Sequence, residues 1–224
     1  MIPLRDSTPG ESFPIVTVTI ILINLLIFYY TSQLNEQGMQ HLFYLFGLVP
    51  GYYLEYDPLP LDYLPFLSSM FLHGSWIHVI SNMWILWLFG DNVEDRMGKV
   101  KFLLFYLLCG IIAAMVHFFI YPYSNVPVVG ASGAVAGIMG AYFIMFRNAQ
   151  VLTFIPPFFL LNLSAWIYLG FWVITQFWGG AVDLFISDSS EQIAFWAHVG
   201  GFAAGALLYR FFLQPRQANS QYTD

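Results

Sequence analysis

Four polar side chains stand out in a chain that is otherwise almost uncharged: Ser132, His198, His78 and Asn82. A serine hydroxyl becomes a nucleophile when an adjacent base accepts its proton, and histidine is the side chain that most often does so. The negative charge that forms on an attacked carbonyl oxygen needs positioned hydrogen-bond donors, which histidine and asparagine can supply. These residue types therefore predict acyl transfer or hydrolysis, provided that the fold brings them together.

The composition indicates which solvent surrounds these residues. The chain has 224 residues, of which 58% are hydrophobic, 20% aromatic and only 9% charged. Water-soluble domains carry about 25% charged residues, and a helix that crosses a bilayer needs about 20 mostly apolar residues. We therefore predict an all-α polytopic membrane protein, a single domain over 1–224 built as a six-transmembrane-helix bundle. The six predicted spans are 14–33, 65–90, 102–121, 130–146, 158–178 and 192–209.

The breaks between these spans carry residues that stop helices. Prolines occur in "YPYSNVP" (121–127) and "IPP" (155–157), and proline disfavours a helix at itself and at the preceding residue. The "GG" pair at 179–180 and "SDSSEQ" at 187–192 are typical of a polar loop. The longest connection, 34–64, is aromatic and acidic, and we expect it to form an ordered first external loop lying at the membrane surface.

The basic residues predict the orientation. They occupy four regions that six crossings place on one side of the membrane: Arg5, Arg96, Lys99, Lys101, Arg147, Arg210 and Arg216. The loops on the other side carry only acidic charges, so the positive-inside rule places both termini in the cytoplasm. We expect no removable signal peptide, because no small-residue cleavage site follows the first apolar segment. A bacterial plasma membrane is the default location, and an organelle membrane is the alternative.

Small residues follow Ser132 and His198 along their predicted helices, and both helices run from the outside to the inside. Small faces let two helix backbones approach closely, so packing these stripes together would bring Ser132 and His198 within reach. The predicted packing residues are Gly133, Ala136, Gly140, Gly201 and Gly205.

The second predicted span carries the other two polar residues. His78 and Asn82 are four positions apart and share one helical face. Because this span also enters from the outside, three helices bring all four polar side chains toward one external depth. A purely structural interpretation remains open for the serine, since small residues in membrane helices mostly serve packing and a serine can hydrogen-bond its own backbone. Ionisable residues inside a membrane are rare and often functional, so the histidines favour chemistry.

The ordered set of motifs resembles the rhomboid family of intramembrane serine proteases. The matching motifs are HxxxN in "HGSWIHVISN", GxSG in "GASGAVAG" and AHxxGxxxG in "AHVGGFAAG", on the second, fourth and sixth predicted spans. The "EDRMGKVKF" stretch also looks like the family's characteristic loop after span two. The resemblance covers essentially the whole chain, in the compact six-span form common in prokaryotes.

The resemblance implies a reaction and a role for each residue. Ser132 would be the nucleophile, His198 the general base and acid, and His78, Asn82 and the Ser132 backbone N–H the oxyanion hole. Such an enzyme would hydrolyse a peptide bond in or next to the transmembrane helix of a membrane-protein substrate, without a cofactor or metal. Spans four and six contain no Asp or Glu, and Glu191 lies seven residues before His198, so we expect a Ser–His dyad rather than a triad. The expected partners are transmembrane-helix substrates and membrane lipid.

Two features of some family members are absent. The first external loop has no Trp–Arg pair, which leaves its fine structure open. Ala136 stands where some members have a tyrosine that stacks on the catalytic histidine, four residues after the nucleophile. Another residue must therefore hold His198.

The remaining histidines and the cysteine do not form a metal site in the sequence. His73 lies about 140° from His78 around a helix, which is a poor arrangement for chelating one metal, and no HExxH motif occurs. We take His73 as a candidate for contacting and supporting the site residues without contacting the substrate. We take His41 and His117 as ordinary loop and helix residues. Cys109 is the single cysteine, so no disulfide forms within the chain.

Other classes of function have less support. The net charge of −6 provides no basic surface for nucleic acid. A small transporter would need charged or repeated elements inside the membrane, and none is visible. The main alternative is a catalytically inactive rhomboid-like protein that binds transmembrane clients, although such relatives typically lack the serine or the histidine that this chain keeps.

Overall fold

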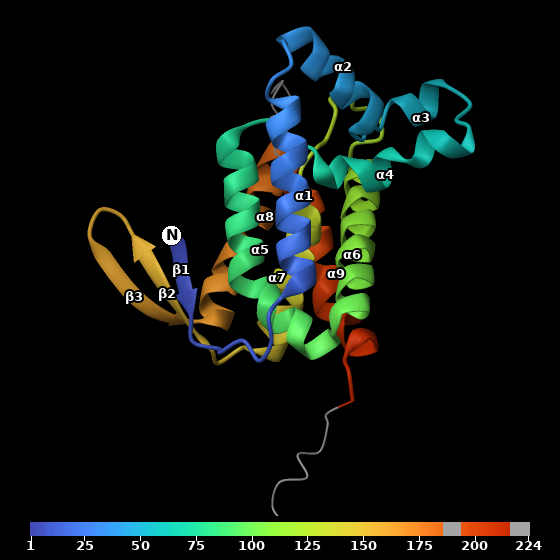
Figure 1. The fold of residues 1–224 in the computed structure, drawn as a ribbon. Helices are drawn as coiled ribbons and strands as arrows, with labels where there is room; N and C mark the ends of the chain where they lie inside the picture. The colour runs from blue at the N-terminus through green and yellow to red at the C-terminus, as the bar shows by residue number, and fades with distance from the viewer. Residues whose placement is uncertain (186–193, 216–224) are drawn as a thin grey trace, which may run out of the picture.

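The computed structural model describes residues 1–185 and 194–215 and shows a mostly helical protein (Figure 1). The long helices are α1 (Ile15–Thr31), α5 (Trp76–Met97), α6 (Lys99–Ile120), α7 (Ser132–Met145), α8 (Ala165–Phe185) and α9 (Phe195–Phe212). The connection from α1 to α5 contains the short elements α2 (Glu36–Phe46), α3 (Tyr52–Glu55), η1 (Pro60–Tyr63), α4 (Pro65–Ser68) and η2 (Ser69–Phe71). Three strands complete the described part of the chain: β1 (Ile2–Asp6), β2 (Gln150–Ile155) and β3 (Phe159–Ser164).

Helix α7 is the central element of the bundle. Every residue from Gly133 to Tyr142 is buried, because α5, α6, α8 and α9 all pack against this helix (Figure 1). Its glycines and alanines leave room for that many neighbours, since small side chains allow helix axes to approach closely. Ser132 is the first residue of α7 and therefore lies at the edge of this core.

The predicted spans agree closely with three of the observed helices. The stretches 14–33, 102–121 and 130–146 correspond to α1, α6 and α7 with shifts of a few residues at each end. The sixth stretch, 192–209, corresponds to α9, although its first two residues lie outside the described part of the chain.

The second predicted span, 65–90, has the wrong bounds. Its first residues form α4 and η2, and the long helix α5 begins only at Trp76, where the Ser75 side chain accepts a hydrogen bond from the His78 backbone N–H. This is the usual way in which serine caps a helix start. At the other end α5 continues to Met97, so "EDRMGKVKF" is not an extended loop. It is a helix end, a single glycine and a new helix, because Gly98 has a φ of +73° that favours glycine and interrupts the helix.

The all-α prediction is also wrong in one region, where the three strands form an antiparallel sheet in the order β1-β2-β3. Ile2 is paired with Phe154, and Gln150 is paired with Ser164. Alternating side chains of β2 are buried, among them Val151 and Thr153, and this period of two is that of a half-buried strand. The predicted fifth span, 158–178, therefore begins as strand β3 and continues as helix α8.

The predicted break at 179–180 is absent, because both glycines lie inside α8. A Cβ on Gly179 would lie 2.6 Å from the Phe195 ring, and one on Gly180 would lie 2.9 Å from the Trp196 ring. The pair therefore makes room for the start of α9 rather than ending a helix. The predicted polar loop at 187–192 lies outside the described residues.

One buried carboxylate holds the start of α1 against α5. Glu94 is 2% exposed and accepts hydrogen bonds from the backbone N–H groups of Val16 (3.0 Å) and Thr17 (2.8 Å). It also accepts one from the Thr17 hydroxyl at 2.9 Å. The N-cap residue of α1 is Pro14, whose side chain makes no capping hydrogen bond. Glu94 therefore satisfies the free N–H groups of a helix start from a neighbouring helix.

Within the described residues, α6 is the one helix that is both long and apolar enough to cross a membrane by length and composition. Helices α1 and α7 are apolar but shorter. The count of six crossings therefore stays a prediction.

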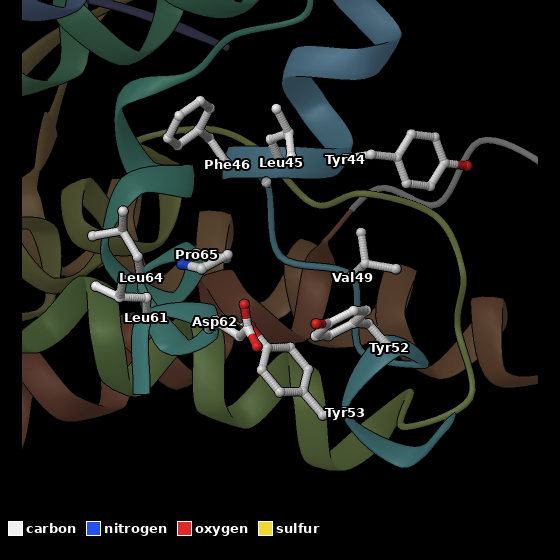
Figure 2. A pocket seen from close by; sticks show the side chains of 11 residues that line it. Tyr44, Leu45, Phe46, Val49, Tyr52, Tyr53, Leu61, Asp62, Leu64 and Pro65 are labelled. Atoms are coloured by element: carbon white, nitrogen blue, oxygen red, sulfur yellow. Dashed lines mark hydrogen bonds between the residues drawn. The ribbon is translucent and has the colours of Figure 1, made fainter. Parts of the chain in front are cut away.

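The connection predicted as the first external loop, 34–64, is ordered and largely helical. It lines a cavity of about 340 Å³. Tyr44, Tyr52 and Tyr53 are among the side chains that line this cavity (Figure 2). The Tyr53 hydroxyl donates a hydrogen bond to the carbonyl oxygen of Asp62, and burial followed by the nearby Asp62 charge raises the pKa of Tyr53 to about 12. None of the four polar residues considered above lines this cavity. The placement of this connection at a membrane surface stays a prediction.

Candidate active site

The structure brings Ser132 and His198 together. The Oγ of Ser132, at the start of α7, lies 2.8 Å from the Nε2 of His198 in the first turn of α9. Both residues are half-buried, so the pair lies at the edge of the bundle core rather than in its middle. The distance is that of a hydrogen bond between a hydroxyl group and a ring nitrogen.

Direct backbone contact between α7 and α9 sets this distance. A Cβ on Gly205 would lie 1.9 Å from the carbonyl oxygen of Gly137, and one on Gly201 would lie 2.0 Å from that of Gly133. A Cβ on Gly140 would lie 2.1 Å from the carbonyl oxygen of Phe202. No side chain larger than hydrogen fits at these contacts.

The observed packing agrees with the prediction except at one position. The predicted packing residue Ala136 is fully buried, and Gly137, which contacts Gly205, is an additional packing residue that the prediction omits. The glycine stripe explains how residues far apart in the sequence reach hydrogen-bond distance.

His78 lies beside Ser132 across Gly130. A Cβ on Gly130 would lie 2.7 Å from the His78 Nε2 and 3.7 Å from the Ser132 Oγ, and the φ of +130° at this residue also favours glycine. Among the described residues, no side chain or backbone group hydrogen-bonds the His78 ring, so its nitrogens remain available to a ligand.

Asn82 lies one turn further along α5 and is buried. Its Nδ2 lies 3.1 Å from the Nε2 of His73, and the Ala131 backbone N–H donates to the same His73 nitrogen at 3.4 Å. His73 thus connects Asn82 to the residue that precedes Ser132. An amide NH2 group carries two hydrogens, so this contact leaves one N–H of Asn82 free.

The start of α7 offers backbone donors at the same place. The N-cap residue, Ala131, makes no side-chain cap, and the N–H groups of the first turn of a helix have no partner within the helix. The first backbone hydrogen bond of α7 runs from the Val135 N–H to the Ala131 carbonyl oxygen. A cavity of about 30 Å³ adjoins Ser132 and Gly133, which is room for a water molecule.

The opposite edge of the His198 ring contacts a residue that sequence reasoning missed. The Nδ1 of His198 lies 2.7 Å from the Oε1 of Gln176 on α8. The Trp172 ring, also on α8, lies 6.0 Å from the His198 ring between centroids. These two side chains, both on α8, hold the His198 ring, a role that Ala136 cannot fill. A single neutral glutamine in an apolar stretch forms no recognisable motif. The one available signal is that Gln176 lies four residues after Trp172 and therefore on the same face of α8.

The remaining predicted side chains stay apart from this group. His41 is exposed on α2, and His117 is buried on α6 with its ring 5.0 Å from that of Tyr121. Cys109 is buried and free. Within residues 1–185 and 194–215, no group of three His, Cys, Asp or Glu side chains could hold a metal ion. Glu191 lies outside the described residues.

Comparison with known proteins identifies curated relatives that share part of this chain. The chain is 35% identical to Rhomboid-like protein 11, chloroplastic, from Arabidopsis thaliana over 119 residues, which are 53% of this chain and 38% of that protein. It is 31% identical to Presenilin-associated rhomboid-like protein, mitochondrial, from Bos taurus over 146 residues, 61% of this chain and 35% of that protein. It is 26% identical to Rhomboid protein 1, mitochondrial, from Saccharomyces cerevisiae over 161 residues, 68% of this chain and 44% of that protein.

The matched regions thus span less than half the length of each of these relatives. The model of the Rhomboid domain matches residues 60–215, a stretch that contains α4 to α9 and all four polar residues. Because this stretch is more than half of the sequence, the chain belongs to the rhomboid family.

Proposed function

We propose that this protein is an intramembrane serine protease that hydrolyses a peptide bond in or next to the transmembrane helix of a membrane-protein substrate. The observation that carries the proposal is the 2.8 Å distance between the Ser132 Oγ and the His198 Nε2. Membership of the rhomboid family makes the protein a membrane protein and supports the same reaction class.

The first half of the reaction uses His198 as a base and then as an acid. The Ser132 Oγ bonds to the carbonyl carbon of the scissile peptide while its hydrogen passes to the His198 Nε2. The oxyanion accepts hydrogen bonds from the Ser132 backbone N–H, the His78 ring and the free N–H of Asn82. His198 then donates the proton to the amide nitrogen as the C–N bond breaks, which leaves an acyl group on Ser132.

The second half repeats these steps with water. His198 removes a proton from a water molecule as the water oxygen bonds to the acyl carbon. The C–O bond to Ser132 then breaks, Ser132 recovers its hydrogen from His198, and the new carboxylic acid leaves. The small cavity beside Ser132 provides space for this water molecule. No cofactor or metal enters any step.

The orientation predicted from the basic residues belongs to this proposal. Figure 1 shows the α5–α6 junction, the end of α7 and the end of α9 at one end of the bundle, opposite α2 and α3. Arg96, Lys99 and Arg210 lie on those elements, which supports cytoplasmic termini and an active site that opens to the other face. The names of the three relatives given above place those proteins in chloroplasts or mitochondria, so these three lend no support to a bacterial plasma membrane.

The substrate requirement follows from the chemistry of a helix. Peptide carbonyls in a helical substrate are hydrogen-bonded and covered by side chains, so the segment must unwind locally before Ser132 can attack. Glycine, proline and small polar residues near the outer boundary of the substrate helix favour such unwinding. Replacing them with leucine slows cleavage on this proposal, and unchanged cleavage rates would contradict this requirement.

A covalent probe tests the catalytic proposal directly. The purified protein in detergent is treated with a fluorophosphonate, alongside Ser132→Ala and His198→Ala variants, and the intact masses are measured. One adduct on the parent protein and none on either variant is the expected result. An unlabelled, folded parent protein would favour the inactive rhomboid-like protein that binds transmembrane clients.

A further inference from the structure

His198 is held at both ring nitrogens by residues from different helices. Its Nε2 lies 2.8 Å from the Ser132 Oγ of α7, and its Nδ1 lies 2.7 Å from the Gln176 Oε1 of α8. A neutral imidazole carries its hydrogen on one nitrogen only. The partner of Nδ1 therefore decides whether Nε2 is free to accept the serine proton.

A third side chain determines which end of the Gln176 amide faces the ring. The Thr175 hydroxyl donates to the Trp172 carbonyl oxygen at 2.6 Å, which uses its only hydrogen. The Gln176 Nε2 lies 3.3 Å from the same hydroxyl oxygen, which can only accept from it. The amide NH2 group therefore faces Thr175, and the amide oxygen is left to face His198.

We propose that Gln176 is a positioning residue that keeps the His198 hydrogen on Nδ1, so that the lone pair of Nε2 faces Ser132. This inference rests on the proposed protease function. The direction of every hydrogen bond follows from the inventory of donors: Oε1 of a glutamine can only accept, so Nδ1 must donate. Ser132 must then donate to Nε2, which is the arrangement that a general base requires.

The neutral amide suits this position. A carboxylate would perform the same orientation but would place a charge among the apolar side chains of α8, where an incompletely paired charge is costly. Gln176 cannot take up the proton itself, so the proton that leaves Ser132 stays on Nε2 until the leaving group or Ser132 receives it. Among the described residues, the titratable side chains that act electrostatically on His198 are His78 of α5 and His117 of α6.

The test compares Gln176→Leu, Gln176→Glu and the matched control Ile174→Ala, whose side chain is 66% exposed on the same helix. The fluorophosphonate labelling rate of Ser132 is measured across pH, together with Tm in detergent. Gln176→Leu loses the acceptor, and we expect labelling to slow by about tenfold, the net value of such a hydrogen bond, and by up to about 10⁴-fold where the wrong tautomer forms. Ile174→Ala should label at the parent rate.

The Gln176→Glu variant separates positioning from packing. Glutamate keeps an acceptor oxygen, so we expect faster labelling than in Gln176→Leu, close to the parent rate at neutral pH. A carboxylate beside the imidazole also stabilises its protonated form, so the acid limb of the pH–rate profile should move to higher pH. If Gln176 only fills space, the two variants should label at similar rates, because their side chains are similar in size, and the acid limb should not move.

The outcomes distinguish this inference from the proposed function. A parent protein that takes no label contradicts the protease proposal itself. A labelled parent protein with Gln176→Leu at the same rate overturns the positioning role alone. Slow labelling in both Gln176 variants, with the same fall in Tm and an unmoved acid limb, assigns Gln176 to packing and also overturns it.

Discussion

The Oγ of Ser132 and the Nε2 of His198 lie 2.8 Å apart although 66 residues separate them in the chain. This distance depends on glycine contacts within about two turns of the pair, where carbonyl oxygens of one helix lie against glycine Cα atoms of the other. The packing of α7 on α9 therefore sets the geometry of the candidate active site.

Replacing Gly205 with alanine should separate the two helices. The added Cβ would lie 1.9 Å from the Gly137 carbonyl oxygen, which is backbone and cannot rotate away. We expect a loss of about 1–3 kcal/mol in the free energy of unfolding, together with slower labelling of Ser132. Thermal unfolding in detergent and the probe reaction measure the two effects.

Gly170→Ala is the matched control for this prediction. Its Cβ would meet only the Phe143 ring at 3.7 Å, an ordinary contact. Alanine favours a helix over glycine by up to about 1 kcal/mol, so Tm should stay the same or rise. An equal fall in Tm for both variants would show that the close contact is not the cause.

His78→Ala should affect the reaction more than the fold. The ring is half-buried, free of hydrogen bonds to the described residues, and lies across Gly130 from the Ser132 hydroxyl. Removing one donor from an oxyanion hole slows a reaction by about 10²–10³, so we expect a fall of this size in the rate of peptide hydrolysis. The measurement is the rate for a cleavable membrane-protein substrate, with Tm as the check on folding.

The neighbouring variant Ile77→Ala provides the comparison, because Ile77 is 79% exposed on the same turn. It should keep the parent rate. If His78→Ala keeps that rate as well, His78 does not stabilise the oxyanion.

Glu94→Leu should destabilise the bundle at the start of α1. The substitution leaves the N–H groups of Val16 and Thr17 buried without their acceptor, and each such group costs about 1–3 kcal/mol. Glu94→Gln keeps one acceptor oxygen and should cost less. Glu55 is exposed on α3, so the control Glu55→Leu should leave Tm unchanged. An equal fall in Tm for Glu94→Leu and Glu55→Leu would contradict the capping role.

The N-terminal segment should respond to pH through Asp6. Burial raises the pKa of this carboxyl above its ordinary value of 3.8, and the hydrogen bond from the Tyr142 hydroxyl offsets only part of the effect. The folded protein therefore binds this proton more tightly than the unfolded chain. The stabilisation is fully present below about pH 3.8 and is lost as the pH rises through the folded pKa.

Asp6→Asn tests this pH dependence. Asparagine keeps an acceptor for the Tyr142 hydroxyl but does not titrate, so its Tm relative to the parent protein should rise as the pH increases from about 4 to 7. Because Asp91 interacts electrostatically with Asp6, the comparison is repeated in an Asp91→Asn background. A Tm difference that does not vary with pH would contradict the prediction.

Several elements could be predicted from the sequence because their determinants are local. Helices α1, α6 and α7 correspond to uninterrupted apolar stretches, and glycine spacing at three and four residues identifies the faces on which α7 and α9 meet. The match to the Rhomboid domain confirms the family that the motifs predict. The six crossings, the orientation and the catalytic roles remain predictions.

Other features depend on partners far away in the chain. Strand β1 is a strand because β2 offers it a pairing edge, and Glu94 caps a helix that begins in a different part of the sequence. Gln176 has no motif and faces His198 only because α8 packs beside α9. Apolar runs and glycine spacing act locally, and for that reason α1, α6, α7 and the small faces of α7 and α9 are predictable from the residues alone. The sheet, the Glu94 cap and the proposed hydrogen on the His198 Nδ1 depend on the folded structure, because their donors and acceptors come from distant parts of the chain.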